Sequence, residues 1–208
     1  MARYTDAVCK LCRREGEKLF LKGSKCYMDK CPFEKKSYPP GERGRVRVKQ
    51  TNYLMQLREK QKVKRIYGIL EKQFKNYFKK ALKTKGIKGK NLLIFLERRL
   101  DNVIYLLGFA ISRPQARQFI NHGHILVDKK KITFPSYQVR VGQEIEVNKK
   151  SRKVEAITLS IAQSSEKEIP LWLQVNHKKF KGNIVSLPER KDIDQSIKEQ
   201  MIVELYSR

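Results

Sequence analysis

The sequence predicts an α+β protein that combines a helical domain, a small helix–sheet module and an N-terminal region organised by four cysteines. Apolar residues recur at helical spacing over residues 52–83 and 91–108, and they alternate singly between residues 125 and 147. All four cysteines lie within residues 1–50, which have no long apolar period of their own. The 208 residues are enough for one large domain or two small ones, each with its own core.

Two helices are expected between residues 52 and 108. Over residues 52–83 the apolar side chains recur at steps of three and four, and the opposite face is rich in Lys and Arg, so one long helix is predicted. The stretch 85–90 contains two glycines and three lysines and is expected to be a linker. A second helix over residues 91–108 has a leucine-rich buried stripe and ends at Gly108.

A short third helix is predicted to begin after Ser112, whose hydroxyl can accept a hydrogen bond from a free N–H of the first turn. Pro114 suits that first turn, where no backbone donor is needed, and Gly123 closes the helix. The period then changes to two, and short strands are expected around a turn at residues 128–131, at 137–141 and at 145–147.

The pattern is weaker towards the C-terminus. Residues 151–168 are expected to be helical or mixed, and the chain around residues 170–173 and near Pro188 is expected to be extended or looped. A final helix is predicted from about Asp194, with an apolar stripe of Ile197, Met201, Ile202 and Leu205.

The charge of the chain favours a polyanionic partner. Lys and Arg number 47 against 21 Asp and Glu, which gives a formal charge of +26. Solubility alone needs a magnitude of only about 2 to 8, whereas binding to nucleic acid releases condensed counterions at each phosphate contact. No apolar run is long enough to span a membrane, the N-terminus lacks a secretory signal, and the basic residues are too widely spread for a membrane-surface helix.

The cysteines predict a structural zinc site. Cys9 and Cys12 are separated by two residues, Cys26 and Cys31 by four, and a loop of 13 residues joins the pairs. Two close pairs can occupy all four positions of a tetrahedral ion, which leaves none for catalysis. Disulfides, buried free thiols and an iron–sulfur cluster remain as alternatives. Lys and Arg residues, including Arg13 and Arg14, surround the cluster.

A donor surface for RNA is predicted on the short helix. Arg113 and Arg117 are four residues apart and share a face opposite Phe119 and Ile120. Polar side chains at the end of this helix and three lysines at positions 129–131 extend the surface, which suits RNA phosphates and sugars.

The segment from Leu96 to Ile132 resembles the S4 RNA-binding module, which pseudouridine synthases, tyrosyl-tRNA synthetases and heat-shock RNA binders share. Segments 56–68, 99–103 and 202–207 resemble the S4 family of small-subunit ribosomal proteins, of the bacterial or organellar type and in its zinc-binding form, and the resemblance covers essentially all 208 residues.

This resemblance implies three parts: an N-terminal extension (1–50), a helical domain (51–90 and 171–208), and an RNA-binding module inserted between its halves (91–170). It implies early binding to the 5′ region of small-subunit rRNA, help in nucleating assembly, and a part in decoding accuracy where mRNA enters the subunit. The implied partners are rRNA, mRNA and neighbouring ribosomal proteins, without membrane or small-molecule substrate. The implied location is the small ribosomal subunit in the cytoplasm, with an organellar ribosome left open.

The basic loop at residues 41–49 matches the family's mRNA path, and anchoring to rRNA is the competing interpretation. No catalytic arrangement is evident, and Asp101 with Asn102 is interpreted as polar surface contacts or a buried hydrogen-bond pair. The predicted RNA-binding side chains are Arg13, Arg14, Arg43, Arg45, Arg47, Lys49, Arg58, Lys60, Lys62, Lys64, Arg65, Arg99, Ser112, Arg113, Gln115, Arg117, Gln118, His122, Lys129 and Lys131.

Overall fold

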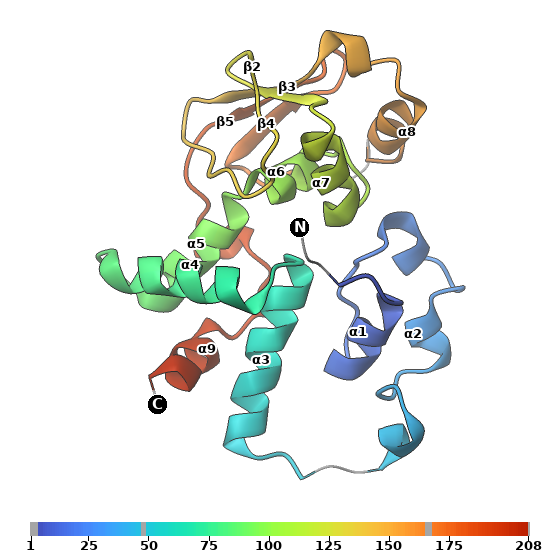
Figure 1. Cartoon of the computed structure of the whole chain (residues 1–208), viewed down its shortest axis with the longest axis vertical. Helices are drawn as coiled ribbons and strands as arrows, with labels where there is room; N and C mark the ends of the chain where they lie inside the picture. Colours follow the sequence, from blue (N-terminus) through green and yellow to red (C-terminus); the bar gives the residue numbers. More distant parts are fainter. Residues whose placement is uncertain (1–3, 47–48, 165–167, 208) are drawn as a thin grey trace. The chain divides into compact units, whose positions relative to one another are not determined.

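The computed structural model describes residues 4–46, 49–164 and 168–207, and it has the expected α+β composition. The chain forms two compact units. Unit 1 consists of Met1–Leu92 and Gln195–Arg208, and unit 2 consists of Leu93–Asp194. In sequence, unit 2 is therefore inserted between the two parts of unit 1 (Figure 1).

Unit 1 is helical in its described residues, and its C-terminal helix packs against its longest one. Phe78 of the fourth helix stacks on Tyr206 at 4.4 Å between ring centroids, and Phe74 lies 6.3 Å from the same ring. Its elements are α1 (Cys9–Glu15), η1 (Gly23–Cys26), α2 (Pro32–Lys35), η2 (Glu42–Arg45), α3 (Asn52–Ile66), α4 (Glu71–Lys83), the first half of α5 (Lys88–Glu97) and α9 (Glu199–Tyr206).

The single helix predicted over residues 52–83 is two helices. Gly68 has a φ of +59°, a left-handed conformation that terminates α3, and Leu70 is extended before α4 begins. The apolar period continues across the break because Tyr67 and Ile69 are themselves buried, at 2% and 5% exposed. Periodicity alone could not reveal this turn, whereas the glycine could.

Unit 2 contains one five-stranded antiparallel sheet in the order β2-β1-β3-β5-β4. Asp128 and Lys129 both have positive φ, as a two-residue type I′ hairpin turn between β1 and β2 requires. The elements are α6 (Leu100–Leu106), α7 (Arg113–Asn121), β1 (Ile125–Val127), β2 (Lys130–Lys131), β3 (Glu144–Val147), η3 (Lys149–Ser151), α8 (Glu155–Ser164), β4 (Leu173–Asn176), β5 (Lys181–Ile184) and η4 (Arg190–Asp192).

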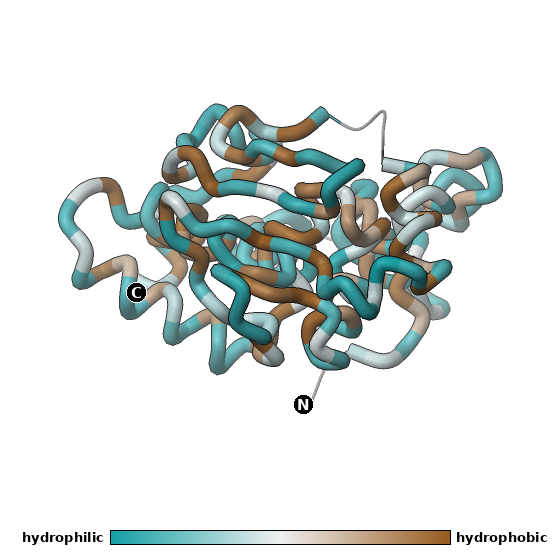
Figure 2. The backbone as a smooth tube through the Cα atoms, turned by 90° about the horizontal axis from the view of Figure 1, so that it is seen from above, coloured by the Kyte–Doolittle hydropathy of each residue, from teal (hydrophilic) through white to brown (hydrophobic). Residues whose placement is uncertain are grey.

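The core of unit 2 lies between one face of this sheet and its helices. Ile145 and Val147 of β3 are fully buried and belong to the same apolar cluster as Ile104 of α6 and Ile120 of α7. Trp172, which is 1% exposed, completes this cluster. Apolar and polar residues alternate along much of the chain (Figure 2).

The helix predicted over residues 91–108 is interrupted at Arg98 and Arg99. Arg99 is extended (φ −70°, ψ 136°) and forms an isolated antiparallel bridge with Gln138, while the N–H of Val139 donates to the carbonyl of Arg98 at 2.9 Å. Residues 137–141, expected as a strand, therefore form only this bridge. A tertiary partner distant in sequence has overridden the helical period.

The hairpin β4–β5 was not anticipated, because residues 170–173 were expected to be extended or looped. β5 pairs with β3 in the middle of the sheet, so residues 171–194 lie in unit 2 and the division falls at Asp194 instead of residue 170. Gly182 of β5 leaves room for Leu107, since a Cβ at position 182 would lie 2.7 Å from the Leu107 side chain. The last helix, α9, begins at Glu199 rather than near Asp194.

Candidate nucleic-acid interface

The short helix α7 forms as the sequence predicts. The Ser112 hydroxyl accepts from the backbone N–H of Gln115 at 3.4 Å, and a proline occupies the first turn. Gly123 ends the helix with a φ of +73°, a conformation that glycine adopts without strain, and the flexible side chain of Lys131 crosses it. Gln115 also stabilises the N-terminus of α7, because its side-chain oxygen accepts a hydrogen bond from the N–H of Ile111 at 2.8 Å.

A buried carboxylate fixes one of the two predicted arginines of α7. Asp101, whose side chain is 1% exposed, accepts from Arg117 Nε at 2.7 Å. It also accepts from Arg99 Nε at 3.0 Å and Arg99 Nη2 at 2.8 Å. Arg99 is itself only 2% exposed, so this predicted RNA-binding residue lies inside unit 2 and orients Asp101.

Asn102 fixes the other arginine. Its Oδ1 accepts from Arg113 Nε at 2.8 Å, and its Nδ2 donates to the Glu97 carboxylate at 2.7 Å. The Arg113 guanidinium also lies over the ring of Tyr105, 4.6 Å from the ring centroid. Asp101 and Asn102 are thus a buried polar pair, as one of the two sequence interpretations held, and they restrict how both arginines can point.

Four further predicted side chains of this module are exposed: Gln118, His122, Lys129 and Lys131. The rings of His122 and His124 are 5.8 Å apart, and His124 Nδ1 lies 2.8 Å from the Ser151 hydroxyl. Burial lowers the pKa of His124, and the nearby His122 and Lys131 lower it further. We call Arg113, Arg117, Gln118, His122, Lys129 and Lys131 the α7 surface.

The basic residues of α3 do not form the open face that was expected. Lys60 and Lys62 are 9% and 4% exposed. Lys62 Nζ lies 2.9 Å from Glu17 Oε1 and donates to the Ser196 carbonyl at 2.9 Å. The Glu71 carboxylate accepts from Lys60 at 2.6 Å and from Lys64 at 3.1 Å. Lys60 and Lys62 are therefore buried with protein partners, and Lys64 is half-buried beside Glu71 of α4.

Arg58 and Arg65 of α3 share the carboxylate of Glu15, whose side chain is 1% exposed. Burial raises the pKa of Glu15, and Arg65 and Arg58 oppose that rise. These two predicted RNA-binding arginines therefore tie the N-terminal region to α3, within unit 1.

The other predicted RNA-binding residues of the first 50 positions are only partly placed. Arg13 donates to the Tyr38 carbonyl at 3.0 Å and lies 5.0 Å from the centroid of its ring, and Arg45 lies 4.8 Å from the same centroid. Arg14, Arg45 and Lys49 are exposed. Arg47 and the side chain of Arg43 lie outside the described part of the chain.

The four cysteines are neighbours in unit 1. Cys12, Cys26 and Cys31 are 5–7% exposed, and none of the four forms a disulfide. Burial raises the pKa of Cys12, the backbone of Leu19 opposes this, and the other three cysteines raise it further. Among the residues that the structure describes, no group of three or more His, Cys, Asp or Glu side chains is arranged to hold a metal ion.

A second basic area, which the sequence did not single out, lies on unit 2. Lys149, Arg152, Lys178 and Lys181 line a depression together with Lys129. They come from separate parts of the chain, so no motif or period connects them. Over the described ranges 4–46, 49–164 and 168–207, no helix combines the length and apolar character that a membrane crossing needs.

The fold and the α7 surface define a class: a strongly basic, two-unit protein whose second unit is a helix–sheet module of the S4 type. A model of the ribosomal protein S4/S9 N-terminal domain matches residues 3–97, and a model of the S4 domain matches residues 98–145. The chain belongs to the uS4 family of small ribosomal subunit proteins, and it is therefore a structural protein rather than an enzyme.

Relatives match over the full length of both chains. Proteins named small ribosomal subunit protein uS4 are 57% identical in Halothermothrix orenii, 55% in Thermoanaerobacter sp. and 54% in Thermodesulfovibrio yellowstonii, each over 208 residues and 100% of both sequences.

Proposed function

We propose that this chain binds the 5′ region of small-subunit rRNA directly and early, and so helps to nucleate assembly of the small ribosomal subunit. The observation that carries the proposal is the α7 surface. Its two arginines, Arg113 and Arg117, are oriented by Asn102 and Asp101, and the other members of the surface, Gln118, His122, Lys129 and Lys131, are exposed. Preorganised cationic side chains lose less conformational freedom when they meet a phosphate.

A binding experiment with the whole chain tests this proposal. A transcript of the 5′ region of small-subunit rRNA is titrated with wild-type protein and with Arg113→Gln at several salt concentrations. Loss of one phosphate contact on duplex RNA should lower the slope of log K against log salt by about 0.9. Lys72→Gln on α4 is the control, because Lys72 is exposed and lies outside the α7 surface. Equal slopes for all three proteins would contradict the proposal.

The basic loop at residues 41–49 is proposed to steer incoming mRNA where it enters the subunit, and so to affect decoding accuracy. Support comes from its charge and from the exposed Arg45 and Lys49. Positive charge can hold single-stranded phosphates without reading sequence. Replacing Arg43, Arg45, Arg47 and Lys49 by Ala should leave assembly near normal and slow translation through a structured message. Failed assembly with normal translation on surviving subunits would make the loop an rRNA anchor.

The four cysteines are proposed to bind one zinc ion. The donor set supports this, since four thiols, three of them buried, gather in a region whose described residues include one other buried apolar side chain, that of Leu19. The N–H of Lys22 also donates to Cys26 Sγ at 3.3 Å, as amides near metal-bound thiolates commonly do. Elemental analysis of protein purified without added metal should give about one zinc per chain. Iron with little zinc would contradict zinc binding.

Cys→Ser variants add a readout that does not depend on metal content. They should increase proteolysis within residues 1–50 while α3, α4 and α9 stay folded, because those helices have an apolar core of their own. The matched control is Ser24→Ala, which lies in the same region but is not a proposed zinc ligand, and it should leave the proteolysis pattern unchanged.

A further inference from the structure

The outer face of the sheet in unit 2 carries a basic depression of about 550 Å³. In β3, Glu146 alternates with the buried Ile145 and Val147, so its side chain lies on the face turned away from the core. Lys181 of β5 pairs with Glu146 in register and lies on that same face. Since α6 and α7 pack on the core side, the depression and helix α7 lie on opposite faces of the sheet.

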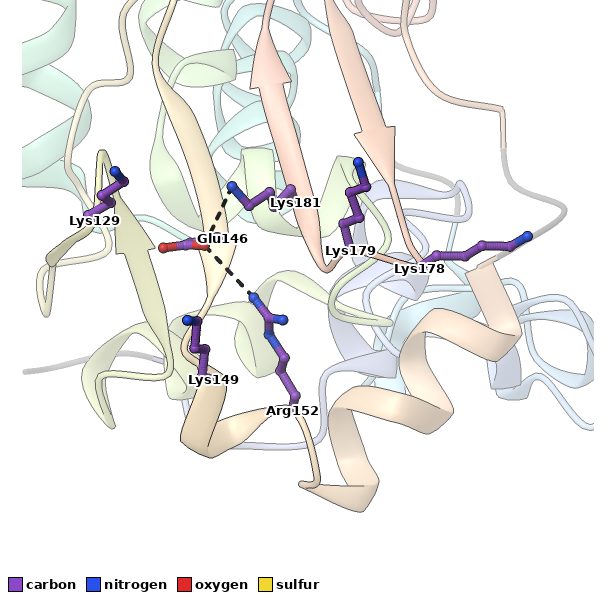
Figure 3. Close-up of a pocket in the computed structure, with 7 residues that line it drawn as sticks. All are labelled: Lys129, Glu146, Lys149, Arg152, Lys178, Lys179 and Lys181. Carbon is purple, nitrogen blue, oxygen red and sulfur yellow. Dashed lines mark ion pairs between the residues drawn. The ribbon is translucent and has the colours of Figure 1, made fainter.

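Six cationic side chains and a single carboxylate line the depression (Figure 3). They are contributed by the β1–β2 turn, β3, η3, and the β4–β5 turn with the start of β5. The lining is Lys129, Glu146, Lys149, Arg152, Lys178, Lys179 and Lys181. We call it the sheet-face site.

The centre of the sheet-face site is held in place by the protein. Glu146 Oε2 lies 3.8 Å from Arg152 Nη2 and 3.9 Å from Lys181 Nζ, the two ion pairs drawn in Figure 3. Arg152 Nε also donates to the Val147 carbonyl at 3.3 Å. Lys181 Nζ lies 2.7 Å from Glu144. These contacts fix two cations in the middle of the site.

The rim of the site is different in character. Lys129, Lys149, Lys178 and Lys179 are exposed, and their charges exceed what Glu146 can neutralise. Lys129 is held at a positive φ of 64° by the hairpin turn. Like charges gathered around a depression raise the local potential and favour an anionic ligand.

The lining identifies the kind of ligand. Lysine and glutamate are depleted at the core of protein–protein interfaces, where aromatic and apolar residues predominate, and none of these lines the site. A single strand would be held by aromatic side chains that stack on its bases, and these are also missing from the lining. A rigid helix of RNA, which presents a regular row of phosphates, matches lysines spread over several turns.

We propose that the sheet-face site binds the sugar–phosphate backbone of a second RNA helix, so that unit 2 holds two RNA segments on opposite sides of its sheet. This inference rests on the proposed rRNA-binding function and adds residues to it, of which only Lys129 belongs to the α7 surface.

The test compares full-length variants on a transcript of the 5′ region of small-subunit rRNA. The variant Lys149→Gln/Lys178→Gln/Lys179→Gln removes three exposed charges and leaves the ion pairs of Glu146 intact. The control Lys72→Gln/Lys75→Gln/Lys79→Gln removes the same charge from the exposed side of α4. The sheet-face variant should lower the slope of log K against log salt by about 2 to 3 units, and the control by much less.

Other outcomes separate this inference from the proposed function. If the sheet-face variant binds like wild type while Arg113→Gln is weakened, the second site is wrong and the proposed function stands. If wild-type protein does not bind the transcript, the proposed function itself fails. An equal loss in the α4 control would assign the effect to net charge and overturn the sheet-face site.

A lysine footprint distinguishes RNA from a protein partner. The rRNA transcript alone should protect Lys149, Lys178 and Lys179 from an amine-reactive reagent. If they are protected only by small-subunit proteins in the absence of rRNA, the face binds an acidic protein and the proposal is overturned.

Discussion

Replacing the buried carboxylate of Asp101 tests the central network of unit 2. Asp101→Asn keeps the shape of the side chain but removes the charge that pairs with Arg99 and Arg117. Arg99 is 2% exposed and cannot reach water, so it would remain as a buried cation without its carboxylate. Removing one partner of a buried ion pair typically costs about 3–5 kcal/mol. We expect unit 2 to lose that much stability.

Trp172 makes the measurement specific. It is the only tryptophan of the chain and lies in the core of unit 2 at 1% exposed, so its fluorescence reports the unfolding of that unit. With a urea dependence of about 1–3 kcal/mol/M, the loss should lower the unfolding midpoint by roughly 2 M.

The matched control is Asp128→Asn in the same unit. Asp128 is exposed, sits at a positive φ of 50° that asparagine tolerates, and accepts from the N–H of Glu144 at 3.0 Å. We expect a change of about 0.5 kcal/mol or less. If Asp101→Asn loses no more stability than this control, the proposal that Asp101 holds the network together is wrong.

Three further predictions concern single residues. Arg117→Ala should lower the stability of unit 2 by about 1.5–3 kcal/mol, because it removes a charged hydrogen bond to Asp101. Phe119→Ala should lower it more, by roughly 3–5 kcal/mol. Urea unfolding followed by Trp172 fluorescence measures both losses, and the reverse order would contradict the prediction. Burial lowers the pKa of His124 in the folded state. Its contribution to stability is therefore complete above pH 6.5 and is lost as the pH falls through the folded pKa. When stability is measured against pH, His124→Gln should lack this dependence. Burial alone would raise the pKa of Glu71, but hydrogen bonds from Lys60, Lys64 and Tyr206 outweigh it and lower the pKa. The contribution of Glu71 to stability is therefore present above pH 4.5 and is lost as the pH falls through the folded pKa. In Glu71→Gln, helix content followed by circular dichroism should show no acid loss from this site.

Local signals in the sequence located the elements that depend on neighbours in the chain. Ser112 and Gly123 marked both ends of α7, and alternation marked β1 and β3, because capping and pleat are local properties. The break at Arg99 and the hairpin β4–β5 depend on distant partners, Gln138 and β3, so no local period could show them.

The candidate site was predictable to a similar extent. The shared face of Arg113 and Arg117 on α7 follows from helical spacing. The role of Asp101 and Asn102 in fixing Arg117 and Arg113 needed three-dimensional contacts. On α3, a stripe of cations appeared to face solvent because sequence does not show that Glu15, Glu17 and Glu71 would reach it. The sheet-face site combines residues from separate turns, and only folding brings them together.

Co-sedimentation with ribosomal subunits tests whether this chain is incorporated into the small subunit. Tagged full-length chain, expressed in a bacterium, is followed through a sucrose gradient and quantified against small-subunit rRNA. Membership of the uS4 family and the α7 surface predict about one copy per small subunit, with strongly reduced incorporation for a variant that combines Arg113→Gln with the sheet-face substitutions. A chain that stays at the top of the gradient, or that sediments with the large subunit, would contradict incorporation into the small subunit.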